Sequence, residues 1–513
     1  MPLRPTRSIA ILLAVLGLFT TISYLEGKLK SYSRGRISII TAPVQHATPP
    51  DPHIVDFWAE IAPIFQKARP QIPPIELKQN LDGVDLQGGD AAKDNRKPFE
   101  KSIGLPQDAV HELTHKHLQL ITHTKVDEAN DRASDIFKGT GIVTVAGGPY
   151  FPPAILSIRM LRRTNSTLPV QVFLQSQSEY ERAICEDVLP ALNAECFVIE
   201  DFLRKGDLFD VTPYQLKVLA MLFSSFQKVL YLDSDCFPLL DPTGLFTSEP
   251  FKSTGFLSWP DYWIATEDPI FYKIAGLPDF PKGVPARSSE TGQLMVDKTK
   301  HLSSLLLATY YNIFGPEIYH PILSQGSLGG GDKETFLAAA VVLKKPFYRT
   351  KEPVGTVGYI DPSAEFHGGA MIQYSPADEW SLAHGGNITT ELEQNPLILT
   401  NHNAKKPRPF FLHANVPKMN VARLLDDKSI FLPNTEQRIR LWGDKNSNTA
   451  MFGYDVEKVV WDEMRHMACD VEARPEDLRG KWRLCDRANQ HYKELFDPKA
   501  VNVPEKKRGG RWI

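Results

Sequence analysis

KVLYLDSD, residues 228–235, is the stretch that decides the predicted fold. Its apolar run is typical of a buried strand, and two acids close it. In an extended chain residues i and i+2 point the same way, so Asp233 and Asp235 can face one ligand. Two acids closing a core strand would be costly without a cation, and paired hard oxygens suit Mn²⁺ or Mg²⁺ shared with a diphosphate. A solvated turn in which an Asp caps the next segment is the other interpretation.

Upstream of this strand, short apolar runs alternate with amphipathic stretches. We expect strands at 141–148, 169–174 and 195–200, and helices at 153–163, 178–189 and 214–226. The alternation predicts an α/β fold with a mostly parallel sheet and helices on both faces. Ligands of such sheets lie at the carboxyl ends of the strands, where Gly147, Gly148 and Tyr150 follow the first strand.

Composition bounds the class of protein. The chain has 513 residues, of which 42% are hydrophobic and 23% charged, which excludes a mainly disordered or fibrous protein. Lys and Arg number 58 against 61 Asp and Glu, a net charge of −3, so no overall basic field predicts a nucleic-acid partner. Forty prolines and 33 glycines without a short period exclude collagen and indicate many loops.

The N-terminal segment predicts a membrane anchor. Residues 8–25 are uncharged and would span roughly 27 Å as a helix, close to the thickness of a bilayer core. A cleaved signal peptide is the alternative, but no small-x-small cleavage site follows the apolar run. We therefore expect a cytoplasmic tail at 1–7, a signal anchor at 8–25 and a stem at 26–95, rich in Pro, Gly and polar residues around one helical stretch at 54–65.

Flanking charge and sequons disagree about the side of the membrane. The basic residues that follow the anchor would by themselves leave the body in the cytosol: Lys28, Lys30, Arg34 and Arg36. The sequons at Asn165 and Asn387 suit a lumenal body, which we expect to comprise a helical lead-in at 96–138 and a catalytic domain at 139–513.

An oxidising compartment would allow disulfides between cysteines that lie close in sequence. Five cysteines are too few for a disulfide scaffold. Cys469 with Cys485, and Cys185 with Cys196, are the pairs near enough to propose, and Cys236 would be left over.

A rival motif is HELTH, with the HExxH spacing that sets His111 and His115 on one helix face and supplies Glu112 as a general base. It predicts a membrane-anchored zinc peptidase. The segment lacks the extended GxxH that would add a third ligand, and nearby His117 and His123 indicate local His enrichment.

Two downstream segments also carry chemistry. GGGDKETF, residues 329–336, brings a glycine turn to the start of an apolar helix, where amides and a Lys could hold an anion and acids could meet sugar hydroxyls. A simple helix cap by Asp332 is the alternative. In FLHANVPK, residues 411–418, the imidazole of His413 could complete a metal shell and Lys418 could meet a phosphate, while a surface loop is the alternative.

These segments, in this order, resemble the fungal alpha-mannosyltransferase family that extends and branches the outer-chain mannan of glycoproteins in the Golgi, most closely its alpha-1,2 branch. The likeness covers roughly residues 100–500 and is carried by GIVTVAGGPY, KVLAMLFSSFQKVLYLDSDCFPLLDPTGLF, SWPDYW, SSETGQLMVDK, GGGDKETF and FLHANVPKMN. It implies a GT-A glycosyltransferase fold, GDP-mannose as donor, Mn²⁺ as cofactor and a single-pass type II Golgi protein. The implied reaction is retaining alpha-1,2 mannosyl transfer to mannan or N-glycan acceptors, with a mannosyltransferase complex as partner.

The resemblance also distributes roles among residues. We expect the metal at Asp233, Asp235 and His413, and the donor at Gly147, Gly148, Tyr150, Lys217, Asp233 and Lys418. We expect the acceptor at Asp261, Tyr262, Trp263 and Glu290, catalytic acids at Asp332 and Glu334, and a disulfide between Cys469 and Cys485.

Other functions stay open at this point. An alpha-1,3- or alpha-1,6-mannosyltransferase, or a transferase of another nucleotide sugar, would use the same chemistry. A carbohydrate-binding relative that has lost catalysis is a third class, against which the intact Asp233 and Asp235 argue.

Overall fold

The structure is a computed structural model that describes residues 47–77, 103–204, 211–277, 281, 284–327, 329–385, 406–470 and 474–496. The chain divides into two units, residues 1–46 and 47–513, and all described residues lie in the second. The expected tail and anchor at 1–25 and the sequon at Asn387 lie outside the described residues. Within those residues, no helix combines the length and the apolar character needed to cross a bilayer.

The main sheet has seven strands, in the order β3-β2-β1-β4-β7-β6-β8. Their bounds are β1 Thr140–Val145, β2 Val170–Leu174, β3 Ala194–Val198, β4 Lys228–Leu232, β6 Phe256–Ile264, β7 Arg287–Asp297 and β8 Tyr348–Arg349. The first four strands run parallel, as the sequence predicts. The sheet is nevertheless mixed, because β7 runs antiparallel to both β4 and β6. The expectation of a mostly parallel sheet therefore needs correction on this side.

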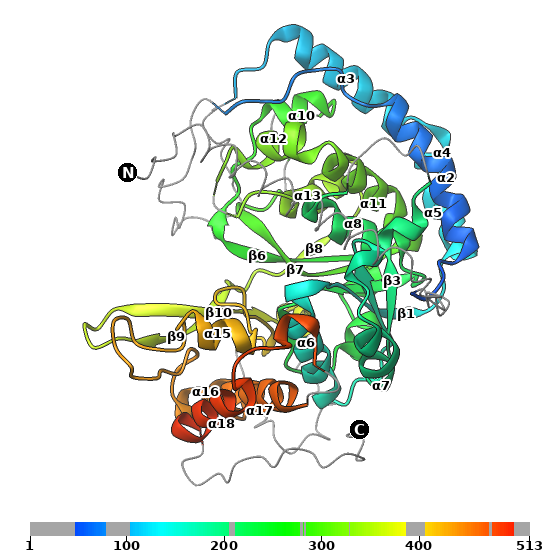
Figure 1. Cartoon of the computed structure of the whole chain (residues 1–513). Coiled ribbons are helices and arrows are strands. Elements are labelled where there is room, and N and C mark those ends of the chain that lie inside the picture. The colour runs from blue at the N-terminus through cyan, green and yellow to red at the C-terminus, as the bar shows by residue number, and fades with distance from the viewer. Residues whose placement is uncertain are drawn as a thin grey trace, which may run out of the picture. The chain divides into compact units, whose positions relative to one another are not determined.

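Helices cover both faces of this sheet (Figure 1). On one face lie α8 Pro213–Phe223, α11 Lys298–Ile313 and α13 Lys333–Val342, and on the other α6 Phe151–Arg163 and α7 Leu189–Ala191. Alternate strand residues enter separate cores, since Val229 and Tyr231 pack on the α8 side and Leu230 on the α6 side. The helix expected at 178–189 is instead a short 3₁₀ turn, Gln177–Glu179, followed by a π-helical turn, Ala183–Val188.

A second, antiparallel sheet has the order β5-β11-β10-β9. Its strands are β5 Cys236–Pro238, β9 Gly355–Ile360, β10 Phe366–Tyr374 and β11 Pro409–His413. This second sheet was not predicted from the sequence. Because β4 ends at Leu232 and β5 begins at Cys236, Asp233-Ser234-Asp235 is the connection that passes from one sheet to the other.

The N-terminal helices form an arc outside α8 and α11 (Figure 1). They are α2 Pro52–Lys67, α3 Gln107–Ile121, α4 Thr124–Asp127 and α5 Ala129–Ile136. Trp58 of α2 and Leu113 of α3 are fully buried in the same core as Val229. Residues 47–77, which fall within the expected stem at 26–95, therefore include a helix that packs as part of the body.

The remaining helices complete the body. Around the main sheet they are α9 Phe251–Thr254, α10 Ile270–Ile274 and α12 His320–Ser324. After β10 the chain forms α14 Pro376–Ala383, α15 Val421–Asp426, α16 Lys445–Phe452, α17 Val456–Cys469 and α18 Leu484–Leu495.

Two disulfides join neighbouring elements. The predicted bond between Cys469 and Cys485 links the end of α17 to the start of α18, and Cys185 is bonded to Cys196 of β3. Cys236 is a buried free thiol, as expected.

His117 lies on the buried face of α3 and makes a testable contribution to stability. Its Nε2 lies 2.7 Å from the hydroxyl oxygen of Tyr311, and burial lowers its pKa to about 4. An unfolded His titrates near ~6.5, so between these values the unfolded chain binds more protons than the folded one. The free energy of unfolding should therefore fall as the pH falls from 6.5 to 4.

His117→Gln keeps a polar partner for Tyr311 but does not titrate. In this variant we expect the slope of the unfolding free energy against pH to decrease by the contribution of about one proton. Urea unfolding at several pH values measures it. His115→Gln, on the exposed face of the same helix, is the matched control and should keep the wild-type slope. Equal slopes in wild type and His117→Gln would refute the assignment.

Candidate active site

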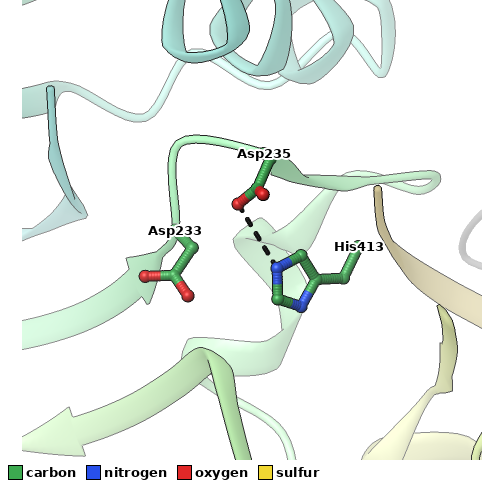
Figure 2. A group of neighbouring side chains, drawn as sticks. All are labelled: Asp233, Asp235 and His413. Carbon is green, nitrogen blue, oxygen red and sulfur yellow. Dashed lines mark ion pairs between the residues drawn. The ribbon is translucent and has the colours of Figure 1, made fainter. Parts of the chain in front are cut away.

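Three predicted metal ligands converge where the two sheets meet. Each of Asp233, Asp235 and His413 offers a donor atom within 4.8 Å of the others' donor atoms. Figure 2 shows Asp235 and His413 turned toward each other with Asp233 beside them. His413 Nε2 lies 3.3 Å from Asp235 Oδ1, and both residues are buried. Residues 178 positions apart (413 − 235) therefore share one site.

Strand pairing explains how His413 reaches Asp235. His413 is the last residue of β11 and stands opposite Cys236, the first residue of β5. The amide of Ala414 donates to the carbonyl of Asp235 at 2.9 Å. Backbone hydrogen bonds thus fix the imidazole beside the carboxylate, with no dependence on a flexible loop.

Glu290 was expected at the acceptor, but the structure places it behind the imidazole. Its Oε1 lies 3.1 Å from His413 Nδ1, and the side chain is buried on β7. Burial opposes ionisation, yet the His413 charge lowers the pKa of Glu290 to about 2. Because Glu290 accepts the Nδ1 proton, the ring is held with Nε2 facing Asp235. Glu290 is therefore a positioning residue for His413, although it also borders the cleft described below.

Lys217 has a similar supporting position under Asp233. Its Nζ donates to the carbonyl and hydroxyl oxygens of Thr291, both at 2.9 Å, and lies 3.4 Å from the Asp233 carboxylate and 3.5 Å from that of Asp332. Burial opposes the charge, but these acids raise the pKa of Lys217 above its usual value. The Asp233 carboxylate also accepts from the hydroxyl of Tyr231 at 2.8 Å. Lys217 therefore holds the carboxylates of Asp233 and Asp332 in place. The sequence predicted it as a donor-binding residue instead.

Lys418 forms an ion pair with Asp235 Oδ2. Its ammonium also lies 5.8 Å from the ring centroid of Tyr150, which connects it to the end of β1. Burial opposes ionisation of Asp235 less than His413 and Lys418 favour it, so the pKa of Asp235 falls well below its usual range. Each carboxylate oxygen of Asp235 thus faces a cation.

An open cleft of about 860 Å³ adjoins the cluster. The predicted residues that line it are Lys217, Asp233, Asp261, Tyr262, Trp263, Glu290, Asp332 and His413. Asp261 is held by Lys333, whose Nζ lies 2.7 Å from Oδ2. The Tyr262 hydroxyl lies 2.6 Å from that of Thr356, so the far wall of the cleft is tied to β9.

The two expected catalytic acids of the GGGDKETF segment lie in different places: Asp332 lines the cleft and Glu334 does not. Asp332 lines the cleft, and burial raises its pKa. It makes no side-chain cap hydrogen bond to α13, so the simple capping alternative does not describe it. Glu334 accepts from the amide and hydroxyl of Ser289, at 2.9 and 3.1 Å, and from the hydroxyl of Ser288. It lines a separate small cavity, and these bonds give it a structural position instead of a catalytic one.

Gly147 and Gly148 follow β1 with φ values of 129° and 47°. A Cβ on Gly147 would lie 2.5 Å from Glu179 Oε2, so the chain turns there only because no side chain is present. The half-exposed Tyr150 follows this turn. All three residues lie at the carboxyl end of β1, next to β4 and Asp233, as the sequence predicted.

The HELTH segment does not form a metal site among the described residues. His111 and His115 are exposed on α3, and Glu112 Oε1 accepts from the amide of Gln71 at 3.2 Å. A second acidic cluster does occur, at Asp361, Glu365 and His367. Asp361 is fully engaged there, since Oδ1 accepts from Ser363 and Glu365 amides and Oδ2 pairs with His367.

Known proteins match the chain over most of its length. Residues 139–282 and 277–375 match the family described as "Mannosyltransferase putative". The chain is 31% identical over 499 residues to alpha-1,2-mannosyltransferase MNN21 of Candida albicans, which covers 86% of this chain and 74% of that protein. The chain belongs to the alpha-1,2-mannosyltransferase family. This confirms the resemblance that the sequence motifs carry.

Two further relatives bear the same description. MNN2 of Candida albicans is 33% identical over 70% of this chain and 65% of its own length, and MNN2 of Saccharomyces cerevisiae is 36% identical over 56% and 53%. The chain thus spans between about half and three quarters of the length of these relatives. Among solved structures, the glycosyltransferase GlyE of Streptococcus pneumoniae aligns with 41% of this chain and 46% of its own, at 16% identity and a TM-score of 0.27, too low to support a conclusion.

Several residues of the cleft were not predicted. Arg287 and Thr291 stand on β7, and Thr356 and Phe366 on the β9-β10 hairpin. Thr291 lies inside the SSETGQLMVDK segment, and this family motif could have identified it as a residue of the cleft. No local pattern marks Phe366 or Thr356, because the sheet that carries them was not expected.

Gly292 tests the coupling of Glu290 to His413. A Cβ at this position would lie 2.4 Å from His413 Nδ1 and 2.6 Å from Glu290 Oε1. In Gly292→Ala we expect Mn²⁺ affinity, measured by calorimetry, to fall about tenfold or more, because the imidazole must move. Gly244→Ala is the matched control, since open space surrounds that Cβ and its φ is not positive. Unchanged Mn²⁺ affinity in a folded Gly292→Ala protein would contradict this role of the imidazole.

Proposed function

We propose that this protein is a retaining alpha-1,2-mannosyltransferase that moves mannose from GDP-mannose to mannose residues of glycoprotein mannan. The observation that carries the proposal is the convergence of Asp233, Asp235 and His413 on one cleft in a chain of this family. An alpha-1,3 or alpha-1,6 linkage would use the same cluster, so the linkage rests on the relatives alone.

The donor set fits a divalent cation such as Mn²⁺. Two carboxylates and one imidazole offer hard oxygens with a nitrogen of intermediate softness, and Glu290 supplies the outer partner that metal-binding imidazoles usually have. A cation held by these residues would neutralise negative charge on a departing diphosphate. This fit supports Mn²⁺ as the cofactor.

The topology supports a nucleotide-sugar site at the same place. Connections from β1 proceed to β2 and β3 on one side, and the next strand, β4, lies on the other side of β1. In open α/β sheets ligands bind at such a switch point, outside the carboxyl ends of the strands. Gly147 and Gly148 after β1, and Asp233 after β4, flank this position. We assign the diphosphate to this crevice, with Lys418 as its cationic partner.

The proposed reaction does not need a base from the enzyme. The bond between C1 of mannose and the diphosphate oxygen breaks, the bond from C1 to the acceptor oxygen forms on the same face, and the acceptor proton passes to the departing diphosphate. Buried charges whose positions are fixed before reaction stabilise such a transition state without further reorganisation. Asp261 and Asp332 line the cleft and are the acids available to orient sugar hydroxyls.

The cellular setting is part of the proposal. A lumenal body anchored in the Golgi membrane would meet glycoprotein mannan or N-glycan acceptors, and the two disulfides agree with an oxidising compartment. Association with other mannosyltransferases belongs to the same expectation. Protease protection in intact microsomes tests the topology, because digestion of the body without detergent would contradict it.

Asp235→Asn should abolish transfer while the protein stays folded. The substitution removes a buried charge from the cation site, and such losses typically cost roughly 10²-fold or more in rate. The assay combines the purified body, Mn²⁺, a panel of labelled nucleotide sugars and mannan oligosaccharides, with thermal melting to check the fold. Turnover near wild type in folded Asp235→Asn would refute the metal assignment.

Two control variants accompany this experiment. Asp135→Asn removes an exposed carboxylate on α5 and should leave transfer unchanged. Glu112→Ala should also keep transfer, whereas loss of a chelator-sensitive proteolytic activity in that variant would favour the HELTH peptidase.

A further inference from the structure

The β9-β10 hairpin lies at the edge of the second sheet and extends away from the main sheet (Figure 1). Thr356 of β9 and Phe366 of β10 line the cleft. The Tyr262 hydroxyl at the end of β6 contacts the Thr356 hydroxyl at 2.6 Å and donates to the carbonyl of Gly355 at 3.2 Å. The base of the hairpin is therefore anchored to β6 beside the cleft.

One face of the hairpin is apolar and open. Phe366 and Ile360 are cross-strand partners, so their side chains share a face, and they are 53% and 71% exposed. Gly358 and Gly368 form the next pair on this face toward the cleft. Phe366, Gly368 and Thr356 line the cleft itself, which makes the face continuous with the site. We call Thr356, Gly358, Ile360, Phe366 and Gly368 the hairpin shelf.

The shelf presents an aromatic ring lying against the backbone. A Cβ on Gly358 would lie 2.7 Å from Phe366 Cζ and 2.1 Å from the carbonyl oxygen of His367. Only glycine therefore lets the ring settle there. The tip of the Phe366 ring thus lies close to Gly358, and about half of the residue is exposed to solvent.

The lining of the cleft combines charged and apolar groups. The charged groups Lys217, Asp233 and Asp332 lie together and suit a diphosphate and its cation. Phe366, Val354 and the exposed Val416 are apolar members of the same lining. Mannose rings have an apolar C–H face that packs on aromatic rings, while their hydroxyls remain in water.

We propose that the hairpin shelf binds the acceptor as an extended chain of several mannose units, with Phe366 stacking on a unit beyond the one that reacts. This rests on the proposed function, since it assigns the second substrate of the same cleft. Acceptor length, in addition to the terminal sugar, then determines how tightly the acceptor binds.

The test compares long and short acceptors in Phe366→Ala. We expect the KM for a mannose tetrasaccharide to rise about tenfold, the loss of one stacking contact, while the KM values for methyl alpha-mannoside and GDP-mannose stay at wild type. Phe366→Trp, which retains an aromatic face, should keep the preference for the long acceptor. Leu118→Ala is the matched control, because Leu118 is also 53% exposed but lies on α3, outside the cleft.

Direct binding separates this inference from the proposed function. Titration of the tetrasaccharide by calorimetry needs no donor, and Phe366→Ala and Ile360→Ser should both weaken it, the second variant without removing the ring. Weakened binding in a protein that never transfers mannose would count against the proposed function alone. Tetrasaccharide binding that both folded variants leave unchanged, or an equal KM increase for short and long acceptors, would overturn the shelf.

Discussion

The compensation of buried carboxylates is the constraint on which the site depends. Four carboxylates converge where the two sheets meet: Asp233, Asp235, Glu290 and Asp332. Buried carboxylates are stable in their charged form only when positively charged groups pair with them. Lys217, His413 and Lys418 do so from a helix, a strand and a loop, so the charges tie together segments far apart in the chain. Removal of one partner leaves another buried charge uncompensated, which explains why supporting residues matter as much as ligands.

The same constraint explains the passage of the chain between the sheets. Asp233 directly follows β4 and Asp235 directly precedes β5, so the two carboxylates stand at the two ends of the connection between the sheets. β7 pairs with β4 and brings Glu290, and β11 pairs with β5 and brings His413. Two backbone pairings therefore assemble the chain of contacts from Glu290 through His413 to Asp235. Side-chain flexibility contributes little to its geometry.

Local patterns predicted what local physics determines. The strands β1 to β4 were predicted from apolar runs, because the residues of a buried strand are themselves apolar. Asp233 and Asp235 were predicted from their place after β4. His413 was predicted as a residue that could complete a metal shell from the FLHANVPK segment, and the family resemblance then joined it to Asp233 and Asp235, since no local pattern identifies Asp235 as its partner. The contact of Glu290 with His413 was not predicted, because the two residues lie 123 positions apart. Asp332 and Glu334 were grouped as neighbours, but near a helix start residues i and i+2 differ by roughly 200° and face different partners.

The second sheet was the larger omission, and it accounts for the part of the cleft that no motif marked. β5, β9 and β10 are short or contain glycine, so their apolar pattern is weak. They form strands through pairing, since β5 and β10 pair with β11 and β9 pairs with β10. Antiparallel hairpins can leave one face to solvent, whereas parallel strands under helices cannot. Joining the two kinds of sheet therefore lets one cleft contain both the buried charged groups that follow β4 and the exposed Phe366 of β10. The connection Asp233-Ser234-Asp235 is where the two sheets join, and backbone pairing on either side of it brings Glu290 and His413 to the two carboxylates.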